Sequence, residues 1–199
     1  YCYRCLQMIW LIRLIKLIVF TGLLGVSALV GFYFYVKDEL PTEDTIRDVR
    51  FQIPMKIYTA DGKLISQFGE KRRTPLLHKE IPQPLIDAIL ATEDARFYEH
   101  YGIDPIGIAV AAFDAIILGK RARGASTITQ QLARNAFLTL DLTVIRKVKE
   151  LYIALHLEQV LSKEEILTLY LNKAFFGNRA YGVGAAAQVY YGKPINQLT

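Results

Sequence analysis

The longest apolar run of the chain lies close to its beginning. Residues Leu17 to Val36 form 20 consecutive positions without a charged side chain. A helix of that length extends about 30 Å, which matches the hydrocarbon core of a bilayer. The run therefore predicts a transmembrane helix over residues 17–36. A cleaved signal peptide is the competing interpretation, but aromatic residues at 32–35 occupy the positions where a cleavage site would need small ones.

The charges beside this run predict its orientation. Arg4, Arg13 and Lys16 precede it, and the first acidic residue of the chain is Asp38. Because basic residues favour the cytoplasmic side, we expect residues 1–16 in the cytoplasm. The rest of the chain, residues 37–199, would then form a domain outside the cytoplasmic (inner) membrane, on its periplasmic side.

Two short patterns follow the apolar run. Residues 37–54 contain two prolines and few apolar repeats, and they predict an extended connector. Residues 55–68 alternate between apolar and polar positions on both sides of Asp61-Gly62, a dipeptide typical of tight turns. A small β-hairpin is expected there.

Apolar residues at helical spacing dominate the rest of the chain, so the expected fold class is mainly α. Three breaks carry helix-start signals, namely Asp104-Pro105, Thr127-x-x-Gln130 and Ser162-x-x-Glu165. The helices that we expect cover residues 84–98, 105–118, 127–137, 143–161, 162–172 and 185–191.

Glu93 interrupts the apolar face of the expected helix 84–98. It lies three and four residues after Leu90 and Ile89 and four before Phe97, on the same helix face. An acid on an apolar face loses hydration, which raises its pKa and prepares it for proton transfer near neutral pH. We therefore expect Glu93 to give or take a proton. The structural alternative is an acid at the edge of the apolar face, or one paired with a buried basic residue.

A second acid, Glu150, follows Arg146 and Lys147 by four and three residues. These spacings place all three side chains on one helix face. The same helix has a broad apolar side, so the charged cluster forms a narrow stripe suited to lining a groove. An ordinary salt-bridged surface is the alternative.

The segment RGASTITQQLARN, residues 123–135, combines the features of an anion site. Gly124 permits a close approach of the backbone, and the helix start at Ser126–Thr127 offers free N–H groups at the positive end of a helix dipole. The surrounding cations are Arg121, Arg123 and Arg134, and the neutral donors are Ser126, Thr127, Thr129, Gln130 and Gln131. This composition favours a phosphate or pyrophosphate, while a solvated polar helix face is the alternative.

Charge and cysteine content give no support to two classes of function, nucleic-acid binding and zinc binding. The net charge is +5, but removing the three basic residues before the apolar run leaves 21 basic and 19 acidic residues, a net charge of +2. So small an excess gives no support to nucleic-acid binding. The two cysteines, Cys2 and Cys5, are spaced CxxC without the second pair that a zinc site needs. The expected external domain has no cysteine, so no disulfide stabilises it.

Four segments together carry a resemblance to a known family. EDARFYEHYG, RGASTITQQ, RKVKE and KEEILTLYLN stand in the order, and at about the spacing, of the signature motifs of the peptidoglycan glycosyltransferases, family 51. The closing stretch NKAFFGNRAYGVGAAAQVYYGK also resembles this family, and the similarity covers residues 51–199. The family comprises the glycosyltransferase domains of class A penicillin-binding proteins and their monofunctional relatives.

The resemblance implies a lysozyme-like helical domain resting on a membrane. It also implies that the domain polymerises lipid II into β-1,4-linked glycan strands, by one displacement with inversion that releases undecaprenyl pyrophosphate. The partners implied are lipid II, the growing glycan strand and membrane lipids. Binding to other cell-wall synthesis proteins is also compatible with the resemblance.

The resemblance also assigns residues. Glu93 corresponds to the general base that deprotonates the acceptor 4-hydroxyl, and Glu150 with Arg146 and Lys147 to the group that holds the departing pyrophosphate. His100 is given a structural role, and Tyr170 a role in shaping the cleft. The positions that correspond to the substrate-lining residues are Asp94, Ser126, Thr127, Gln130, Gln131, Arg134, Asn135 and Asn172.

Three alternatives stay open. A divalent cation, Mg²⁺ or Mn²⁺, bound with the substrate diphosphate beside Asp94 is compatible with the motifs, although no dedicated ligand cluster is visible. A lytic glycoside hydrolase also uses a cleft acid on a lysozyme-like scaffold, but it needs no diphosphate site. A non-catalytic membrane-anchored scaffold would need no acid at position 93.

Overall fold

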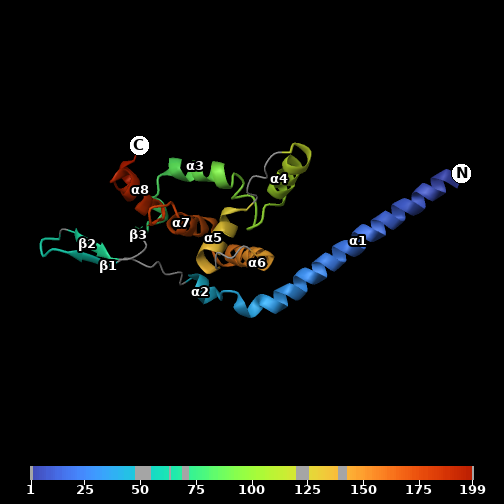
Figure 1. Cartoon of the computed structure of the whole chain (residues 1–199), viewed down its shortest axis with the longest axis horizontal. Helices are drawn as coiled ribbons and strands as arrows, with labels where there is room; N and C mark the ends of the chain where they lie inside the picture. Colours follow the sequence, from blue (N-terminus) through green and yellow to red (C-terminus); the bar gives the residue numbers. More distant parts are fainter. Residues whose placement is uncertain are drawn as a thin grey trace. The chain divides into compact units, whose positions relative to one another are not determined.

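The computed structural model describes residues 2–47, 55–62, 64–68, 72–119, 126–138 and 143–198. It divides into two compact units, Tyr1–Leu40 and Pro41–Thr199. Each unit is described by itself below. Figure 1 gives the element labels.

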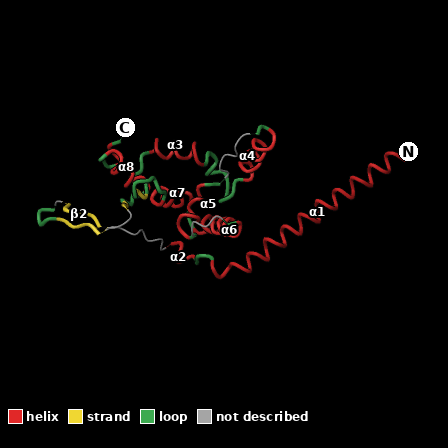
Figure 2. The backbone as a smooth tube through the Cα atoms, viewed as in Figure 1, coloured by secondary structure: helices red, strands yellow, loops and turns green. Residues whose placement is uncertain are grey.

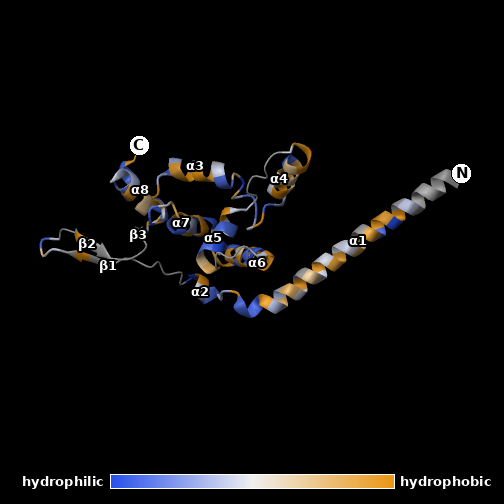
Figure 3. Cartoon of the chain, in the orientation of Figure 1, coloured by the Kyte–Doolittle hydropathy of each residue, from blue (hydrophilic) through white to orange (hydrophobic). Residues whose placement is uncertain are grey.

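The first unit consists of one long helix, α1 (Cys2–Val36), and a 3-10 turn, η1 (Lys37–Glu39). The expected span at 17–36 is helical, and the helix begins 15 residues earlier than that span. The 28-residue segment Ile12–Glu39 has the length and the apolar composition of a helix that crosses a membrane. Apolar side chains such as Phe20 and Leu24 are exposed along it. In Figure 3, orange bands of hydrophobic residues alternate with paler ones along this helix.

The second unit is mainly helical (Figure 2), as the sequence predicts. Its helices are α2 (Glu43–Arg47), α3 (Gln83–Glu93), α4 (Pro105–Ile117), α5 (Ile128–Phe137), α6 (Val144–Val160), α7 (Lys163–Lys173) and α8 (Val183–Tyr191), with the 3-10 turns η2 (His78–Glu80) and η3 (Ile195–Gln197). The predicted hairpin is confirmed as the antiparallel pair β1 (Met55–Tyr58) and β2 (Leu64–Phe68). A second, parallel pair joins β3 (Arg72–Arg73) to β4 (Ala180–Tyr181), and it was not expected.

The core of this unit lies where α5 packs against α6 and α7. Leu132 of α5, Ile153 and Leu157 of α6, and Leu167 and Leu171 of α7 are each 0–1% exposed. Burying a side chain of this size contributes about 1.5–3 kcal/mol. The three helices therefore form a rigid base for the polar side chains at their ends.

Local capping explains where the helices begin. Asp104 accepts the N–H of Gly107 at 3.0 Å and opens α4, as predicted. Ser162 and Glu165 form the predicted reciprocal capping box at the start of α7. Thr127 caps α5 by accepting the N–H of Gln130 at 3.2 Å, but the Gln130 side chain accepts a hydrogen bond from a lysine instead of completing the box.

Two predicted elements were wrong in part. The helix expected over 84–98 ends at Glu93, because Asp94 leaves helical geometry with φ −161° and ψ 74°. The connector expected over 37–54 contains the short helix α2. Its Arg47 and Glu43 pair at i, i+4 and its Ile46 is buried. Residues 48–54 of that connector lie outside the described residues.

Candidate active site

Glu93 is the last residue of α3, and its side chain is exposed. Ile86, two turns earlier on the same face, is 2% exposed, and Ile89 and Leu90, one turn earlier, are half-buried. The expectation that Glu93 is dehydrated within that face was wrong, because α3 ends at this residue and its side chain is exposed. Its Oε2 accepts a hydrogen bond from Nε2 of Gln131 at 2.9 Å.

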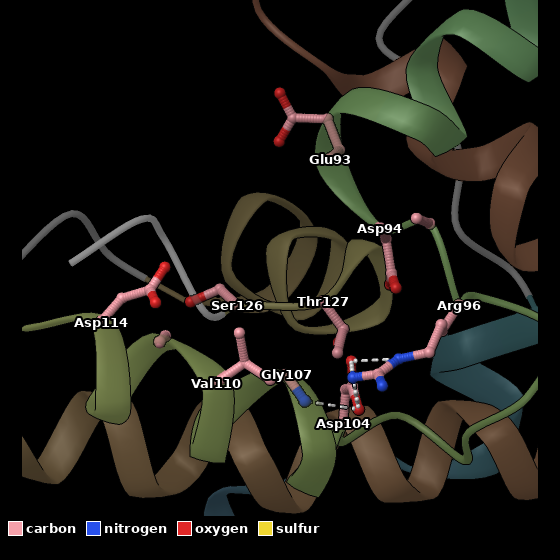
Figure 4. A pocket seen from close by; sticks show the side chains of 11 residues that line it. Glu93, Asp94, Arg96, Asp104, Gly107, Val110, Asp114, Ser126 and Thr127 are labelled. Atoms are coloured by element: carbon pink, nitrogen blue, oxygen red, sulfur yellow. Dashed lines mark hydrogen bonds and ion pairs between the residues drawn. The ribbon is translucent and has the colours of Figure 1, made fainter. Parts of the chain in front are cut away.

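Glu93 lies at the rim of a pocket of about 420 Å³. The lining side chains come from the end of α3 and the turn after it, from one face of α4, and from the residues that open α5. In Figure 4, Asp114 of α4 and Ser126 lie across the pocket from Glu93. The lining residues are Glu93, Asp94, Ala95, Arg96, Asp104, Gly107, Val110, Ala111, Asp114, Ser126 and Thr127.

Asp94 is buried beside this rim and fastens α3 to α5. Its carboxylate accepts hydrogen bonds from Nε2 of His100 at 3.0 Å and from the N–H of Ile128 at 2.9 Å. The second bond satisfies a free N–H group at the start of α5, where a negative charge is also favoured by the helix dipole. Thr127 adds a further tie by donating its hydroxyl to the carbonyl of Gly102 at 2.6 Å.

Arg96 and Asp104 form an ion pair that holds the turn after α3 against the start of α4. Their closest atoms, Nη2 and Oδ2, lie 2.6 Å apart (Figure 4). Partial burial disfavours the charged form of Asp104, but hydrogen bonds from Arg96 and from Gly107 N–H outweigh it and hold the pKa of this carboxyl below its ordinary value of 3.8. The sequence marked Asp104 as a cap and gave no sign of its pairing with Arg96.

The cationic cluster of α6 is arranged around a fully buried acid. The Glu150 side chain has 0% exposure; its Oε2 accepts from Nη1 of Arg146 at 2.8 Å and its Oε1 accepts from Nζ of Lys147. Arg146 is largely buried and Lys147 is 41% exposed. The shared helix face predicted for these residues is confirmed. Because Glu150 has no exposed surface, the two cations are the members of the cluster that a ligand could reach.

Lys147 connects this cluster to the start of α5. Its Nζ donates to Oγ of Ser126 at 2.9 Å and to Oε1 of Gln130 at 3.3 Å. Ser126 lines the pocket, whereas Gln130 is 1% exposed. Gln130 therefore orients Lys147 from the protein interior and is not among the residues that line the pocket.

The remaining candidates occupy different places. Asn135 is exposed on α5, and Arg134, half-buried on the same helix, is close enough to Tyr170 for its charge to act on that phenol. Asn172 is 4% exposed, and its amide bonds both the N–H and the carbonyl of Leu76 at 2.8 Å. Asn172 thus fixes the segment before α3, and it is not among the residues that line the pocket.

The sequence missed one contact near Glu93. Tyr170, 7% exposed on α7, donates its hydroxyl to Oε1 of Gln131 at 3.3 Å. Its place in the fourth motif was the signal that could have found it. Arg121, Arg123 and Gly124, which were expected to complete the anion site, lie outside the described residues.

Comparison with known proteins identifies the family. A family model described as transglycosylase matches residues 61–199, which is more than half of the chain. The chain belongs to the transglycosylase family. The resemblance of its four motifs to the peptidoglycan glycosyltransferases is thereby confirmed.

The transglycosylase relatives include penicillin-binding proteins 1A. The chain is 59% identical to the one from Vibrio cholerae over 94% of its own length and 23% of the relative's, and 57% identical to the one from Escherichia coli K12 over 89% and 21%. It thus spans about a fifth of these curated relatives. A crystal structure of penicillin-binding protein 1A from Haemophilus influenzae matches 75% of this chain and 13% of that one, with 36% identity and a TM-score of 0.34.

Proposed function

We propose that this chain polymerises lipid II into the β-1,4-linked glycan strands of peptidoglycan. Glu93 is the general base for the acceptor sugar, and Arg146 and Lys147 hold the pyrophosphate of the donor. Family membership supports the reaction class. The hydrogen bonds of Glu93 and Lys147 to the segment that opens α5 support the residue roles, although Arg146 and Lys147 do not themselves line the pocket.

One observation carries these roles. Two residues at the start of α5 form hydrogen bonds with the proposed catalytic groups, one with the acid Glu93 and the other with the cation Lys147. Gln131 donates to Glu93 at 2.9 Å, and Ser126 accepts from Lys147 at 2.9 Å. A single short segment, residues 126–131, is therefore bonded to both the acid and the cation. A glycosyl transfer to a hydroxyl with a diphosphate leaving group needs a base for the hydroxyl and a cation for the diphosphate.

Glu93 takes the proton of the acceptor 4-hydroxyl while that oxygen forms a bond to the anomeric carbon of the donor. The bond from that carbon to the phosphate oxygen breaks, and its electron pair leaves on undecaprenyl pyrophosphate. The charges of Lys147 and Arg146 stabilise the growing negative charge of the leaving group, and Glu150 keeps both cations in place.

The surface of α4 supports a lipid-borne substrate. Its apolar side chains are exposed along the whole helix, among them Ile106 at 61%, Phe113 at 56% and Ile116 at 79%. Exposed apolar side chains gathered on one helix are typical of contact with a membrane, a lipid or another protein, and a lipid-borne substrate is one such ligand. The same helix supplies Asp114, Gly107 and other residues to the pocket, so the pocket opens beside an apolar face. The proposal also includes the location of the chain. We propose that α1 anchors it in the cytoplasmic membrane and that residues 37–199 lie on the periplasmic side.

Asp94 is poorly suited to bind the Mg²⁺ or Mn²⁺ ion that the sequence motifs allow. That carboxylate is buried and bonded by His100 and by the N–H of Ile128, so its oxygens are committed to the protein. Among the described residues, no group of three or more His, Cys, Asp or Glu side chains is placed to hold a metal ion. No step of the proposed reaction is assigned to a metal.

The proposal is tested with the purified chain in detergent and fluorescent lipid II, with strand length read by gel electrophoresis. We expect strands that lengthen with time, and we expect moenomycin, the inhibitor of this family, to stop them. A hydrolase would instead shorten finished glycan and leave lipid II intact. A non-catalytic scaffold would do neither, and either result would overturn the proposal.

A further inference from the structure

We propose that Tyr170 is a positioning residue for the proposed reaction: it fixes the side-chain amide of Gln131, and through that amide it sets the orientation of the Glu93 carboxylate. The inference rests on the proposed function for its catalytic meaning. Its structural content, a three-residue chain of hydrogen bonds, can be tested without any turnover.

The chain of bonds runs from the protein interior to the pocket rim. Oη of Tyr170 donates to Oε1 of Gln131 at 3.3 Å, and Nε2 of Gln131 donates to Oε2 of Glu93 at 2.9 Å. Tyr170 is 7% exposed on α7, Gln131 is half-buried on α5, and Glu93 is exposed at the end of α3. The buried end is therefore the rigid one, and the exposed end is the one that needs support.

The chemistry of the amide gives the chain its direction. A glutamine amide has a donor end and an acceptor end, and it can be inserted either way round. With the phenol donating to Oε1, the N–H groups face Glu93. The reverse orientation would set the carbonyl oxygen against the carboxylate, two acceptors without a proton between them. The carboxylate of Glu93, which only accepts, thus selects the orientation, and the hydroxyl of Tyr170 holds the amide in it by donating to Oε1.

The phenol of Tyr170 keeps its proton near neutral pH. Burial, followed by the negative charge of Glu93, raises the pKa of Tyr170 to about 12, against a smaller opposing effect of the Arg134 charge. A protonated phenol can donate, so the buried end of this series of hydrogen bonds has a donor near neutral pH.

The result is a carboxylate with one oxygen held and one directed outward. Within the described part of the chain, Oε2 is the oxygen of Glu93 that takes part in a hydrogen bond. Oε1 is left for a substrate hydroxyl at the pocket rim. Since a general base must lie within hydrogen-bond reach of its proton, loss of this orientation lowers the rate of the chemical step more than substrate binding.

The matched pair of substitutions is Tyr170→Phe and Tyr190→Phe. Each removes one tyrosine hydroxyl that donates to an oxygen, and Tyr190 donates to the carbonyl of Phe176, away from the pocket residues. In lipid II polymerisation we expect Tyr170→Phe to lower kcat about 5- to 30-fold with KM changed less than about twofold, because only the geometry of the base is lost. Tyr190→Phe should stay within about twofold of the unsubstituted chain in both constants.

A double substitution separates positioning from a general loss of packing. Gln131→Ala should lower kcat to a similar extent, and Tyr170→Phe added to it should have almost no further effect, because the residue through which it acts is gone. Losses in kcat that multiply would overturn the inference, as would a Tyr170→Phe effect confined to KM or one equal to that of Tyr190→Phe.

A spectroscopic measurement tests the same chain in the absence of turnover. In ¹H–¹⁵N spectra of the detergent-solubilised chain, Gln131→Ala identifies the Gln131 side-chain amide signals. Glu93→Gln should shift these signals, and Tyr170→Phe should bring the two amide protons closer together in chemical shift, as expected for an amide that is no longer held. Unchanged Gln131 signals in Tyr170→Phe would overturn the inference even if polymerisation were established. Conversely, a failure of polymerisation would leave this readout intact and would count against the proposed function alone.

Discussion

Glu93 and Gln131 are 38 residues apart in the chain, and their side chains are joined by a 2.9 Å hydrogen bond. The bond connects the end of α3 to the first turn of α5. The buried carboxylate of Asp94 makes a parallel connection one residue later, through the N–H of Ile128. The base therefore does not depend on burial for its role in the proposed reaction. It depends on being held against α5, and Gln130 of the same helix accepts a hydrogen bond from the cation Lys147.

Lys147 is the more exposed of the two cations that surround Glu150 on α6. Its replacement tests the proposed diphosphate site. Lys147→Met removes a charged donor at the same length of side chain. We expect the apparent affinity for lipid II to fall about ten- to hundredfold, the value of one charge-assisted hydrogen bond. Titration of fluorescent lipid II measures it. Lys79→Met, on the exposed turn η2, removes the same charge away from the pocket and should have no such effect.

Glu150 has a structural role that can be measured separately from activity. Glu150→Ala leaves two cations beside a buried site without their counter-charge, so we expect the free energy of unfolding to fall by about 3 kcal/mol. Urea unfolding followed by circular dichroism measures this change. Glu43→Ala is the matched control, because it breaks the Arg47–Glu43 pair at the same i, i+4 spacing on the surface. That variant should lose under about 1 kcal/mol. Equal losses in the two variants would contradict the central place of Glu150 in the cluster.

Asp104 predicts a particular dependence of stability on pH. Its pKa is held below the ordinary value of 3.8 in the folded chain, so its ion pair with Arg96 stabilises the fold above that value. The contribution is lost as pH falls through the lower, folded-state pKa. Asp104→Asn should therefore reduce the thermal midpoint at pH 6 and make the midpoint fall less steeply below about pH 4. Glu165 also has a lowered pKa, through the N–H and hydroxyl of Ser162, and Glu165→Gln should act in the same direction. A midpoint of Asp104→Asn that runs parallel to the unsubstituted chain at all pH values would contradict the assignment.

The elements set by local chemistry could be predicted from the sequence. The hairpin around Asp61-Gly62, the start of α4 at Asp104 and the capping box at Ser162 depend on residues within a few positions of one another. The stripe from Arg146 to Glu150 is equally local. Such patterns are read from one segment at a time, and the structure has them where the sequence placed them.

The features that depend on distant residues could not be predicted. The end of α3 at Glu93 is fixed by Asp94, whose partners include Ile128, 34 residues away. Asn172 was expected to line the substrate, but its amide is bonded to Leu76, 96 residues earlier in the chain. The contact of Tyr170 with Gln131 is of the same kind. Helical spacing placed Glu93 on a buried face because it carries no information about where a neighbouring segment ends the helix.

The substitution Glu93→Gln tests the central claim most directly. Its amide keeps an oxygen that can accept from Gln131, so the local geometry is retained while the proton acceptor is lost. Polymerisation of lipid II by this variant should fall at least about 100-fold, the usual contribution of a general base, with lipid II binding within about threefold of the unsubstituted chain. Turnover within a few-fold of the unsubstituted chain would contradict the assignment of Glu93 as the base.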